Sequence, residues 1–372
     1  MSDSSLAAKG TLGLSVAMGI GRFFYTPLLP IMMVALNWSD SVASWIAAAN
    51  YLGYLLGSVA LSRNWLSATT ALYRGSMVIS TLLLAAMAMT DNSAVHVVLR
   101  LIAGAASAAI FVCVTQFVNQ NVHTPSHVGV VYGGVGLGIT VSGLVAWLLG
   151  HSMSWSQLWL VAAAISAIFT AVAWQWPVNR KTAISPSTSV SSDARTAEDL
   201  SRAFRLLDAG YFFQGFGYII IGTYLVVLAG PVFGSAAAAI TWVVAGIAAV
   251  PSPYLWSSLA ERFGRRRALL SCYVLQVIGA VAAIFGTSTV LLIVASILFG
   301  ATFMGVTMLT ISTGVAHGIS GGSARLTSWY SLGQVAGPAI IGLVFADSIT
   351  ASFIVAAIAI AVGLLTVQLS RL

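Results

Sequence analysis

Arg22 lies within the stretch GIGRFFYTPLLP, residues 19–30, and the surrounding apolar run 11–36 holds no other charge. A charge near the centre of a membrane-spanning helix costs about 2.5–3.5 kcal/mol on insertion scales, so its side chain requires a partner or a polar cavity. Carbonyl groups of a neighbouring helix are one such partner, and a substrate or a titrating group is the other. Tyr25 and Thr26 follow about one helical turn later on the same face, so they are candidate contacts for the same ligand.

Three further pairs combine an aromatic ring with an amide one helical turn away: Asn50 with Tyr54, Gln214 with Tyr218, and Tyr330 with Gln334. Each pair offers a face that is partly apolar and partly polar, as small-molecule sites require. Amides also join neighbouring helices and tyrosines collect at membrane surfaces, so a packing role is the alternative for every pair. We predict that all three pairs belong to the same substrate-binding set as Arg22.

Arg100 and Asp208 are the other charged candidates within or at the edge of apolar runs. Arg100 is close in sequence to Asp91 and His96, so an ion pair or a side chain extended to the membrane surface is one interpretation. Asp208 follows Arg205 by about one turn, and an exposed pair between these two is the simpler interpretation. No other carboxylate falls inside an apolar run. Asp208 is therefore the main candidate for a carboxylate that carries a proton.

The composition excludes several classes of protein. Of the 372 residues, 59% are hydrophobic and 7% are charged, whereas soluble domains carry about 25% charged residues. Such a chain cannot cover a globule with polar groups, which predicts a polytopic membrane protein. Cys113 and Cys272 lie within apolar runs and are expected to be buried, with no disulfide or metal role. Without a phosphate-binding loop or a nucleophile–base or metal cluster, neither an ATP-driven pump, an enzyme nor a cofactor is predicted.

Apolar stretches of about 20 residues, the length that crosses a bilayer, occur twelve times. We therefore predict an all-α polytopic membrane protein with twelve transmembrane helices in two six-helix bundles. The predicted spans are 11–36, 41–62, 68–90, 94–118, 127–149, 154–176, 204–229, 235–260, 268–286, 288–312, 326–346 and 348–370. Pro27 and Pro30 remove helix hydrogen bonds, which predicts a kink in the outer part of the first span.

The basic residues test this assignment. If both termini are cytoplasmic, every Lys and Arg outside the spans falls in an inside segment, and the outside loops carry Asp40, Asp91 and Asp347. Cytoplasmic loops collect Lys and Arg. The net charge of +7 thus reports loop topology and not nucleic-acid binding. We predict a multi-pass protein of a bacterial inner membrane with both termini in the cytoplasm.

A segment rich in Ser and Thr interrupts the apolar pattern at 177–203. It has too little apolar surface to fold alone and predicts a flexible cytoplasmic linker. The linker divides the chain into an N-terminal six-helix bundle at 1–176 and a C-terminal six-helix bundle at 204–372.

The two halves share a glycine pattern. Gly19 and Gly21 recur 196 residues later as Gly215 and Gly217, and Gly104 recurs at the same offset as Gly300. A shared offset at separate places indicates a duplication. Parallel duplicated halves with a central site are typical of secondary transporters.

The loop SSLAERFGRRR, residues 257–267, is similar to a loop signature of the major facilitator superfamily, with Ser257 in place of its glycine and Glu261 in place of its aspartate. The resemblance implies a gating role for the loop residues Glu261, Arg262, Gly264, Arg265 and Arg266. The corresponding first-half loop, 57–68, has lost the acid and most of the basic residues.

Two further stretches extend this resemblance. RLIAG, residues 100–104, resembles the fourth-helix motif of the superfamily, which implies a proton-coupling role for Arg100. The stretch around Arg22, together with YFFQGFGYIIIGTYL at 211–225, resembles the YbfB/YjiJ-type branch of the superfamily. That resemblance implies the transporter fold and leaves the substrate open.

We therefore predict a secondary active transporter that moves a small organic solute, anionic or polar, by alternating access coupled to protons. The fixed charge of Arg22 favours an anion, because no carboxylate lies at comparable depth. The alternative is a proton-driven exporter of lipophilic or cationic compounds that depends on Asp208. The expected partners are the solute, protons and the lipid bilayer, and we expect a monomer that binds no nucleic acid.

Overall fold

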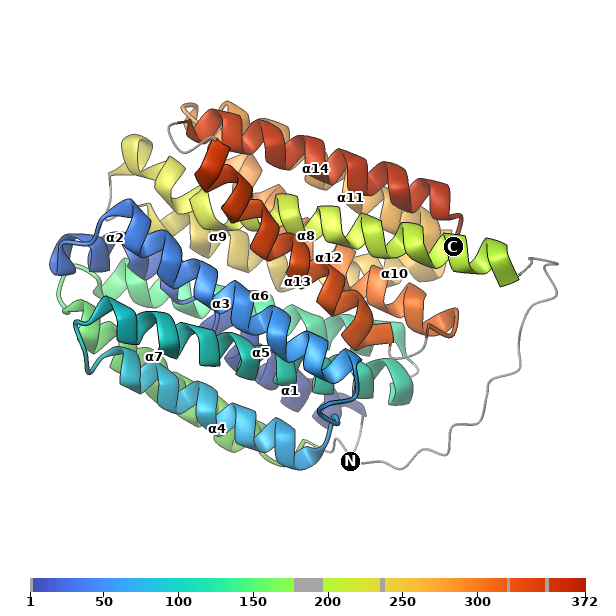
Figure 1. Ribbon diagram of the computed structural model, residues 1–372, viewed down its shortest axis with the longest axis horizontal. Coiled ribbons are helices and arrows are strands. Elements are labelled where there is room, and N and C mark those ends of the chain that lie inside the picture. The colour runs from blue at the N-terminus through green and yellow to red at the C-terminus, as the bar shows by residue number, and fades with distance from the viewer. Residues whose placement is uncertain (1–2, 123, 177–196, 235–237, 320–321, 345–347) are drawn as a thin grey trace.

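The computed structural model describes residues 3–122, 124–176, 197–234, 238–319, 322–344 and 348–372, and every regular element in these ranges is a helix (Figure 1). The first set of helices consists of α1 (Asp3–Leu14), η1 (Ser15–Ile20), α2 (Tyr25–Leu36), α3 (Asp40–Ser62), α4 (Thr70–Met87), α5 (Ser93–Asn121), α6 (Pro125–Leu149) and α7 (Trp155–Ala173). The second set consists of α8 (Ala197–Phe233), α9 (Ala239–Ala249), α10 (Ser252–Phe263), α11 (Arg265–Ile284), α12 (Thr289–Ala316), α13 (Gly322–Val344) and α14 (Ile349–Ser370). Residues 177–196 of the predicted linker lie outside the described residues.

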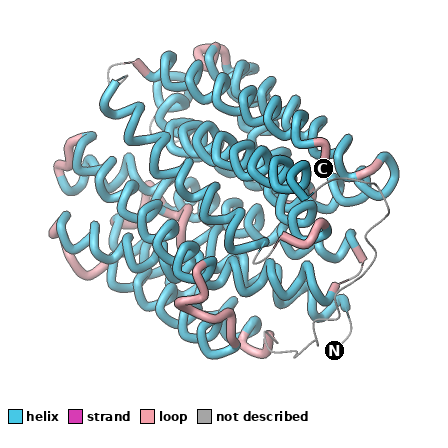
Figure 2. The backbone as a smooth tube through the Cα atoms, turned by 45° about the vertical axis from the view of Figure 1, so that its right-hand side comes forward, coloured by secondary structure: helices cyan, strands magenta, loops and turns pink. Residues whose placement is uncertain are grey.

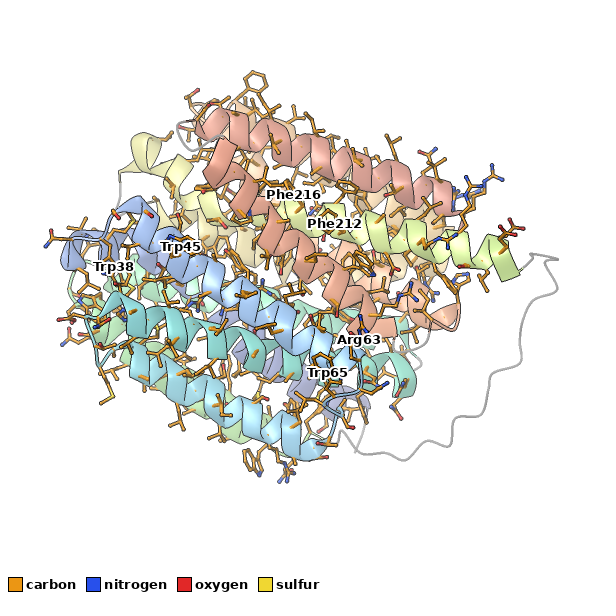
Figure 3. All side chains as sticks on the ribbon, viewed as in Figure 1. Trp38, Trp45, Arg63, Trp65, Phe212 and Phe216 are labelled. Atoms are coloured by element: carbon orange, nitrogen blue, oxygen red, sulfur yellow. The ribbon has the colours of Figure 1, made fainter. Side chains whose placement is uncertain are left out.

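The helices are those of a membrane protein. Within the described residues, 11 spans are long and apolar enough to cross a bilayer, and the predicted span 326–346 corresponds to α13, a helix of 23 residues. The helices run side by side, with both termini at one end of the molecule (Figure 1). Arg63 and Trp65 lie toward that end, and Trp38 and Trp45 toward the other (Figure 3). Exposed tryptophans near both ends suit the two membrane surfaces, and the predicted all-α membrane fold is confirmed.

The first span is not a continuous α-helix. In and after η1, the backbone nitrogens of Gly21 and Phe23 bond carbonyl groups five residues earlier, at 2.8 and 3.0 Å, and residues 21–24 form a turn. The kink predicted at Pro27 and Pro30 is misplaced, because the break precedes Pro27. Pro27 has no N–H to give to the Phe23 carbonyl, which instead accepts from the Thr26 nitrogen at 3.2 Å. Pro30 remains inside α2.

The same helix pairing occurs in both sets. Gly104 on α5 lies so close to α3 that a Cβ there would overlap the Asn50 carbonyl oxygen. Gly300 on α12 lies in the same way against α9, where a Cβ would overlap the Ala245 carbonyl oxygen. Small residues permit such close backbone approach. The recurrence of the contact at the offset of 196 residues supports the predicted duplication.

The two sets meet along two lines. On one side α6 packs along α9 and α10 through Gly129, Gly133, Gly136 and Gly143, where an added Cβ would come within 3.0 Å of the second set. On the other side α3 packs against α13. Figure 2 shows the same side-by-side arrangement of helices from a second direction. The turn at 21–24 contacts the second set on both sides, because Arg22 bonds Gln334 on α13 and Phe23 lies against Trp242 on α9.

Two helix boundaries differ from the predicted spans, and a glycine connects α10 to α11. α8 begins at Ala197, before the predicted start at 204. The predicted span 235–260 is divided at Val250 and Pro251 into α9 and α10. Gly264 joins α10 to α11 with φ of 91°, a conformation that glycine adopts without steric cost. The loop signature therefore requires its glycine for backbone reasons.

We expect Gly104→Val to destabilise the protein, because the added side chain would push α5 away from the Asn50 carbonyl. Overpacking of this kind typically costs about 1–3 kcal/mol. The measurement is the thermal midpoint of the purified protein in detergent. Gly75→Val is the matched control, because a Cβ at Gly75 on α4 meets nothing within 4 Å. Equal midpoints for the two variants would contradict the packing described for α3 and α5.

Candidate functional site

Arg22 connects the two sets of helices. Its Nη2 donates to Oε1 of Gln334 on α13 at 2.6 Å. The neighbouring Phe23 ring lies edge-on to Trp242 on α9, with ring centres 6.0 Å apart. Arg22 is 1% exposed and Gln334 is 0% exposed. The partner of the buried charge is thus an amide of the other set and not a row of carbonyl groups, which was the alternative for Arg22.

Aromatic rings surround the Arg22 guanidinium. Its Cζ lies 4.1 Å from the ring centre of Tyr54, and 5.4 Å from the ring centres of both Tyr51 and Phe23. Each cation–π contact contributes about 0.5–2 kcal/mol. Nε and Nη1 are buried and have no hydrogen-bond partner. These two nitrogens are therefore strong, uncommitted donors for a ligand that carries acceptors.

The second set presents a cluster of stacked rings. Tyr218 on α8 stacks on Phe299 with ring centres 5.3 Å apart, and on Phe303 with ring centres 5.1 Å apart. The Tyr330 ring on α13 lies 5.8 Å from Tyr218. Trp242 joins this cluster to the Arg22 side, because its ring centre is 6.2 Å from that of Phe299. The site is therefore charged on one side and aromatic on the other.

Hydrogen-bond donors outnumber acceptors around this cluster. The Tyr54 and Tyr218 hydroxyls, the Trp242 Nε1 and the Gln334 Nε2 are buried and unpartnered. The same holds for both amide atoms of Gln214. An acceptor-rich ligand would satisfy the larger number of these groups.

The structure brings together five of the predicted residues: Arg22, Tyr54, Tyr218, Tyr330 and Gln334. A binding role for them stays a prediction. Tyr51, Trp242 and Phe299 lie beside them, and sequence reasoning did not single these three out. Rings in uniformly apolar helices look alike whether they face lipid or the interior, so the sequence held no signal for Trp242 and Phe299. Tyr51 adjoins the Asn50–Tyr54 pair, and this proximity was the only available signal for it.

Arg100 on α5 stabilises the break in the first span. Its Nη1 donates to the Gly21 carbonyl at 3.1 Å, and its Nη2 donates to the Arg22 carbonyl at 2.8 Å. The side chain is buried, 3% exposed. The interpretation as an ion pair or extended side chain at the membrane surface is therefore wrong. Arg100 satisfies carbonyl groups at the turn and fixes the backbone that carries the Arg22 side chain.

Three predicted ligand contacts have other surroundings. The Asn50 amide donates to the Arg100 carbonyl at 3.0 Å, and the Tyr25 hydroxyl donates to the Ala43 carbonyl at 3.1 Å. The Tyr25 ring lies under Arg100, 5.1 Å from its Cζ. Thr26 is half-buried in the first turn of α2. Asn50 and Tyr25 thus hold the Arg100 region, and a direct ligand contact for these three residues stays a prediction.

Asp208 on α8 pairs with Arg325 on α13. The Arg325 Nη2 lies 2.5 Å from the Asp208 Oδ2. Among the carboxylates whose side chains the structure describes, Asp208 is the one that is buried. The exposed pair with Arg205 is therefore wrong, because the Asp208 side chain points into the second set. A proton-coupling role for Asp208 stays a prediction.

The loop residues with a predicted gating role lie at the end where the termini are. Arg262 lies over the Phe263 ring, and Arg266 donates to the Gln368 carbonyl at 2.9 Å within the second set. Glu261 and Arg265 line a cavity of about 430 Å³. The cavity is bounded by α5 and α6 of the first set and by α10, α11 and α12 of the second. Two of the residues with a predicted gating role therefore line a cavity between the two sets.

The helix count, the duplicated pairing and the buried site between two sets define a membrane transporter of the 6+6 kind. A family profile described as "Uncharacterised MFS-type transporter YbfB" matches residues 14–368. The chain therefore belongs to this family of the major facilitator superfamily, as the motifs predict, and it is a multi-pass membrane protein and not an enzyme. A search of curated proteins found no match.

Solved structures share the fold. The human organic anion transporter MFSD10 (TETRAN) is similar with a TM-score of 0.73 and 17% identity, over 99% of this chain and 100% of that chain. The nucleoside transporter NupG, crystallised as a mutant, is similar with a TM-score of 0.64 and 18% identity, over 99% of this chain and 98% of that chain. At this identity the likeness concerns the fold alone.

We expect Arg100→Met to lower stability and to displace Arg22. The substitution leaves two buried carbonyl groups unsatisfied, each at a cost of about 1–3 kcal/mol. The measurement is the thermal midpoint in detergent. The matched control is Arg74→Met, because Arg74 also donates to a backbone carbonyl, that of Trp174 at 2.9 Å, but at an exposed site. Midpoints that fall by equal amounts would show that Arg100 has no special role at the turn.

Proposed function

We propose that this protein is a secondary active transporter that moves a small organic solute, anionic or polar, by alternating access. The observation that carries this proposal is the buried Arg22 guanidinium, with two uncommitted nitrogens at the boundary between the two sets of helices. A fixed charge in a medium of low dielectric constant favours a ligand with the opposite charge. The solved relatives are named as transporters of organic anions and of nucleosides, which supports a small organic solute.

The two sets of helices, α1 to α7 and α8 to α14, would move relative to one another around this site. In transporters with duplicated halves, alternating access is largely a rigid-body movement of one half against the other around a fixed site. The glycine-rich line of α6 with α9 and α10, and the line of α3 with α13, are the surfaces that would slide or separate. The loop residues Glu261 and 262–266 would control the opening at their end.

Proton coupling would act through Asp208. A protonated Asp208 carries no charge and would hold Arg325 less strongly. Arg325 and Gln334 lie on the same helix, about 13 Å apart along its axis at the usual rise of 1.5 Å per residue. Protonation at Asp208 and solute binding at Arg22 would therefore act on the same element, α13. Arg100, which supports the Arg22 turn, would transmit part of this coupling.

The orientation follows from charge. Arg63, which follows α3, lies toward the end where both termini lie (Figure 3), and Arg266 bonds the Gln368 carbonyl near the C-terminal end of α14. We propose that this end faces the cytoplasm of a bacterial cell and that the protein resides in the inner membrane. Export of lipophilic cations, the alternative, would need an uncommitted carboxylate in the membrane. The charge of Asp208 is paired with Arg325 through Oδ2, which weighs against it, although Oδ1 is buried without a partner.

We expect Arg22→Ala to abolish transport while the protein stays folded. Loss of a hydrogen bond to a charged group corresponds to about 10- to 100-fold in solute affinity. Arg22→Lys should restore transport only in part, because Lys lacks the planar fork. The measurement is flux in proteoliposomes with a panel of matched anionic, neutral and cationic compounds. Arg63→Ala, at an exposed position, is the control. Full flux in Arg22→Ala would remove Arg22 from the site.

We expect Asp208→Asn to separate transport from its driving force. Flux driven by a pH gradient should fall about tenfold or more, whereas exchange of solute across the membrane without a gradient should persist, because buried carboxylates in transporters relay protons. Both fluxes are measured in the same proteoliposomes. Glu198→Gln, at an exposed position of the same helix, is the control. Unchanged gradient-driven flux would exclude Asp208 as the proton carrier.

A further inference from the structure

The two hydrogen-bonding forks of the Arg22 guanidinium share one nitrogen, and that nitrogen is the one bonded to Gln334. A carboxylate binds an arginine bidentately either through Nε and Nη2 or through Nη1 and Nη2. Nη2 donates to Gln334 Oε1 at 2.6 Å, whereas Nε and Nη1 are unpartnered. Nη2 carries two N–H groups, one in each fork, and Gln334 accepts from one of them. An anion that binds the fork on that side must therefore displace Gln334, whereas one that binds the opposite fork shares Nη2 with it.

A carboxylate is the stronger competitor for this nitrogen. The Gln334 amide is neutral, so its bond to Arg22 leaves the positive charge without a counter-charge. A carboxylate supplies that counter-charge, and charge-assisted bonds are roughly twice as strong as neutral ones. The gain is larger in a buried site than in water, because the effective dielectric constant is lower. A neutral carbonyl compound would gain nothing over Gln334.

The groups around Arg22 also select the body of the ligand. The Tyr54 ring lies 4.1 Å from the guanidinium carbon. On the other side of the boundary stand Trp242 and Tyr218, both with unpartnered polar atoms and both in contact with the Phe299 ring. A flat ring fits such surroundings better than a flexible chain, since offset and edge-on ring contacts each add about 0.5–1.5 kcal/mol.

We propose, on the basis of the transport function proposed above, that the solute is an organic carboxylate with a flat ring. When it binds, its carboxylate displaces the Gln334 amide from Arg22. The side-chain hydrogen bonds between the two sets include Arg22 to Gln334 at 2.6 Å, Tyr51 to Thr223 at 3.0 Å, and Ser58 to Ser331 at 3.4 Å. Of these three bonds, the one from Arg22 involves a charge. The solute breaks that connection and so releases α13 from the turn at 21–24.

The test uses the full chain in lipid nanodiscs with three probes of one shape: benzoate, benzamide and protonated benzylamine. Wild-type protein should bind benzoate about tenfold or more tightly than the other two. Gln334→Leu removes the competing acceptor and should raise benzoate affinity about threefold or more. Gln334→Glu installs a permanent carboxylate beside Arg22 and should lower benzoate affinity about tenfold or more.

Two controls isolate the effect of Gln334. Gln276→Leu removes another buried glutamine with an unpartnered amide, on α11 away from Arg22, and should leave benzoate affinity unchanged. Thr223→Val removes a different bond between the two sets and should not raise it. Equal binding of the three probes, or benzoate affinities in Gln334→Leu and Gln334→Glu that match the wild type, would overturn the proposal.

A measurement without any probe separates this proposal from the transport function itself. Spin labels at the exposed positions 66 and 263, one in each set, report the distance between the sets. Gln334→Leu alone should shift the distances in the direction that benzoate shifts them in the wild type, and Gln334→Glu should suppress the benzoate effect. If two distance populations are present and neither substitution changes their proportions, the role of Gln334 alone would be overturned. A single unchanging distance in all samples would overturn alternating access, and this proposal with it.

Discussion

The structure depends on the buried positive charge of Arg22, which no carboxylate among the described residues neutralises. An uncompensated charge in a protein interior costs several kcal/mol even after relaxation. Arg22 offsets part of this cost through the Tyr54 ring and the bond to Gln334, which contribute about 0.5–2 and about 1.5–3 kcal/mol by their types. These contacts hold the guanidinium in place without cancelling its charge. The site therefore remains electrostatically incomplete, which is the property that an anion-binding site requires.

The break in the first span makes this placement possible. A continuous helix would bond the carbonyl groups of Gly21 and Arg22 within itself. The π-helical segment and the turn leave both carbonyls available, and Arg100 donates to them from α5. A second arginine so close to the first would be repelled by it, but its charge is directed at the carbonyl dipoles of the turn. Arg100 thus stabilises the turn and also adds positive potential behind Arg22.

Local sequence determined the helices but not their partners. Hydropathy and the distribution of Lys and Arg predicted the spans, because each depends on the composition of one segment. The glycine offset indicated the duplication, and the structure shows its physical basis, because a Cβ at Gly104 would overlap the Asn50 carbonyl oxygen. By contrast, Gln334 is 312 residues from Arg22, and Arg325 is 117 residues from Asp208. No local pattern specifies which of many polar residues meet across helices, so sequence reasoning assigned Asp208 to its neighbour Arg205.

The two sets of helices differ at corresponding positions near the site. The break in the first span explains why the first set has an arginine on α5 where the second set has a serine on α12. Position 22 of the first half corresponds to Tyr218 of the second, and Arg100 corresponds to Ser296. α8 continues through the corresponding region as one helix of 37 residues, so its carbonyl groups are bonded within the helix and need no arginine. Ser296 accordingly donates to the Leu292 carbonyl of its own helix at 2.8 Å. The broken helix with its supporting arginine and the intact helix with its ring therefore occupy corresponding positions of the two sets. A ligand held between them would meet a charge on one side and an aromatic surface on the other.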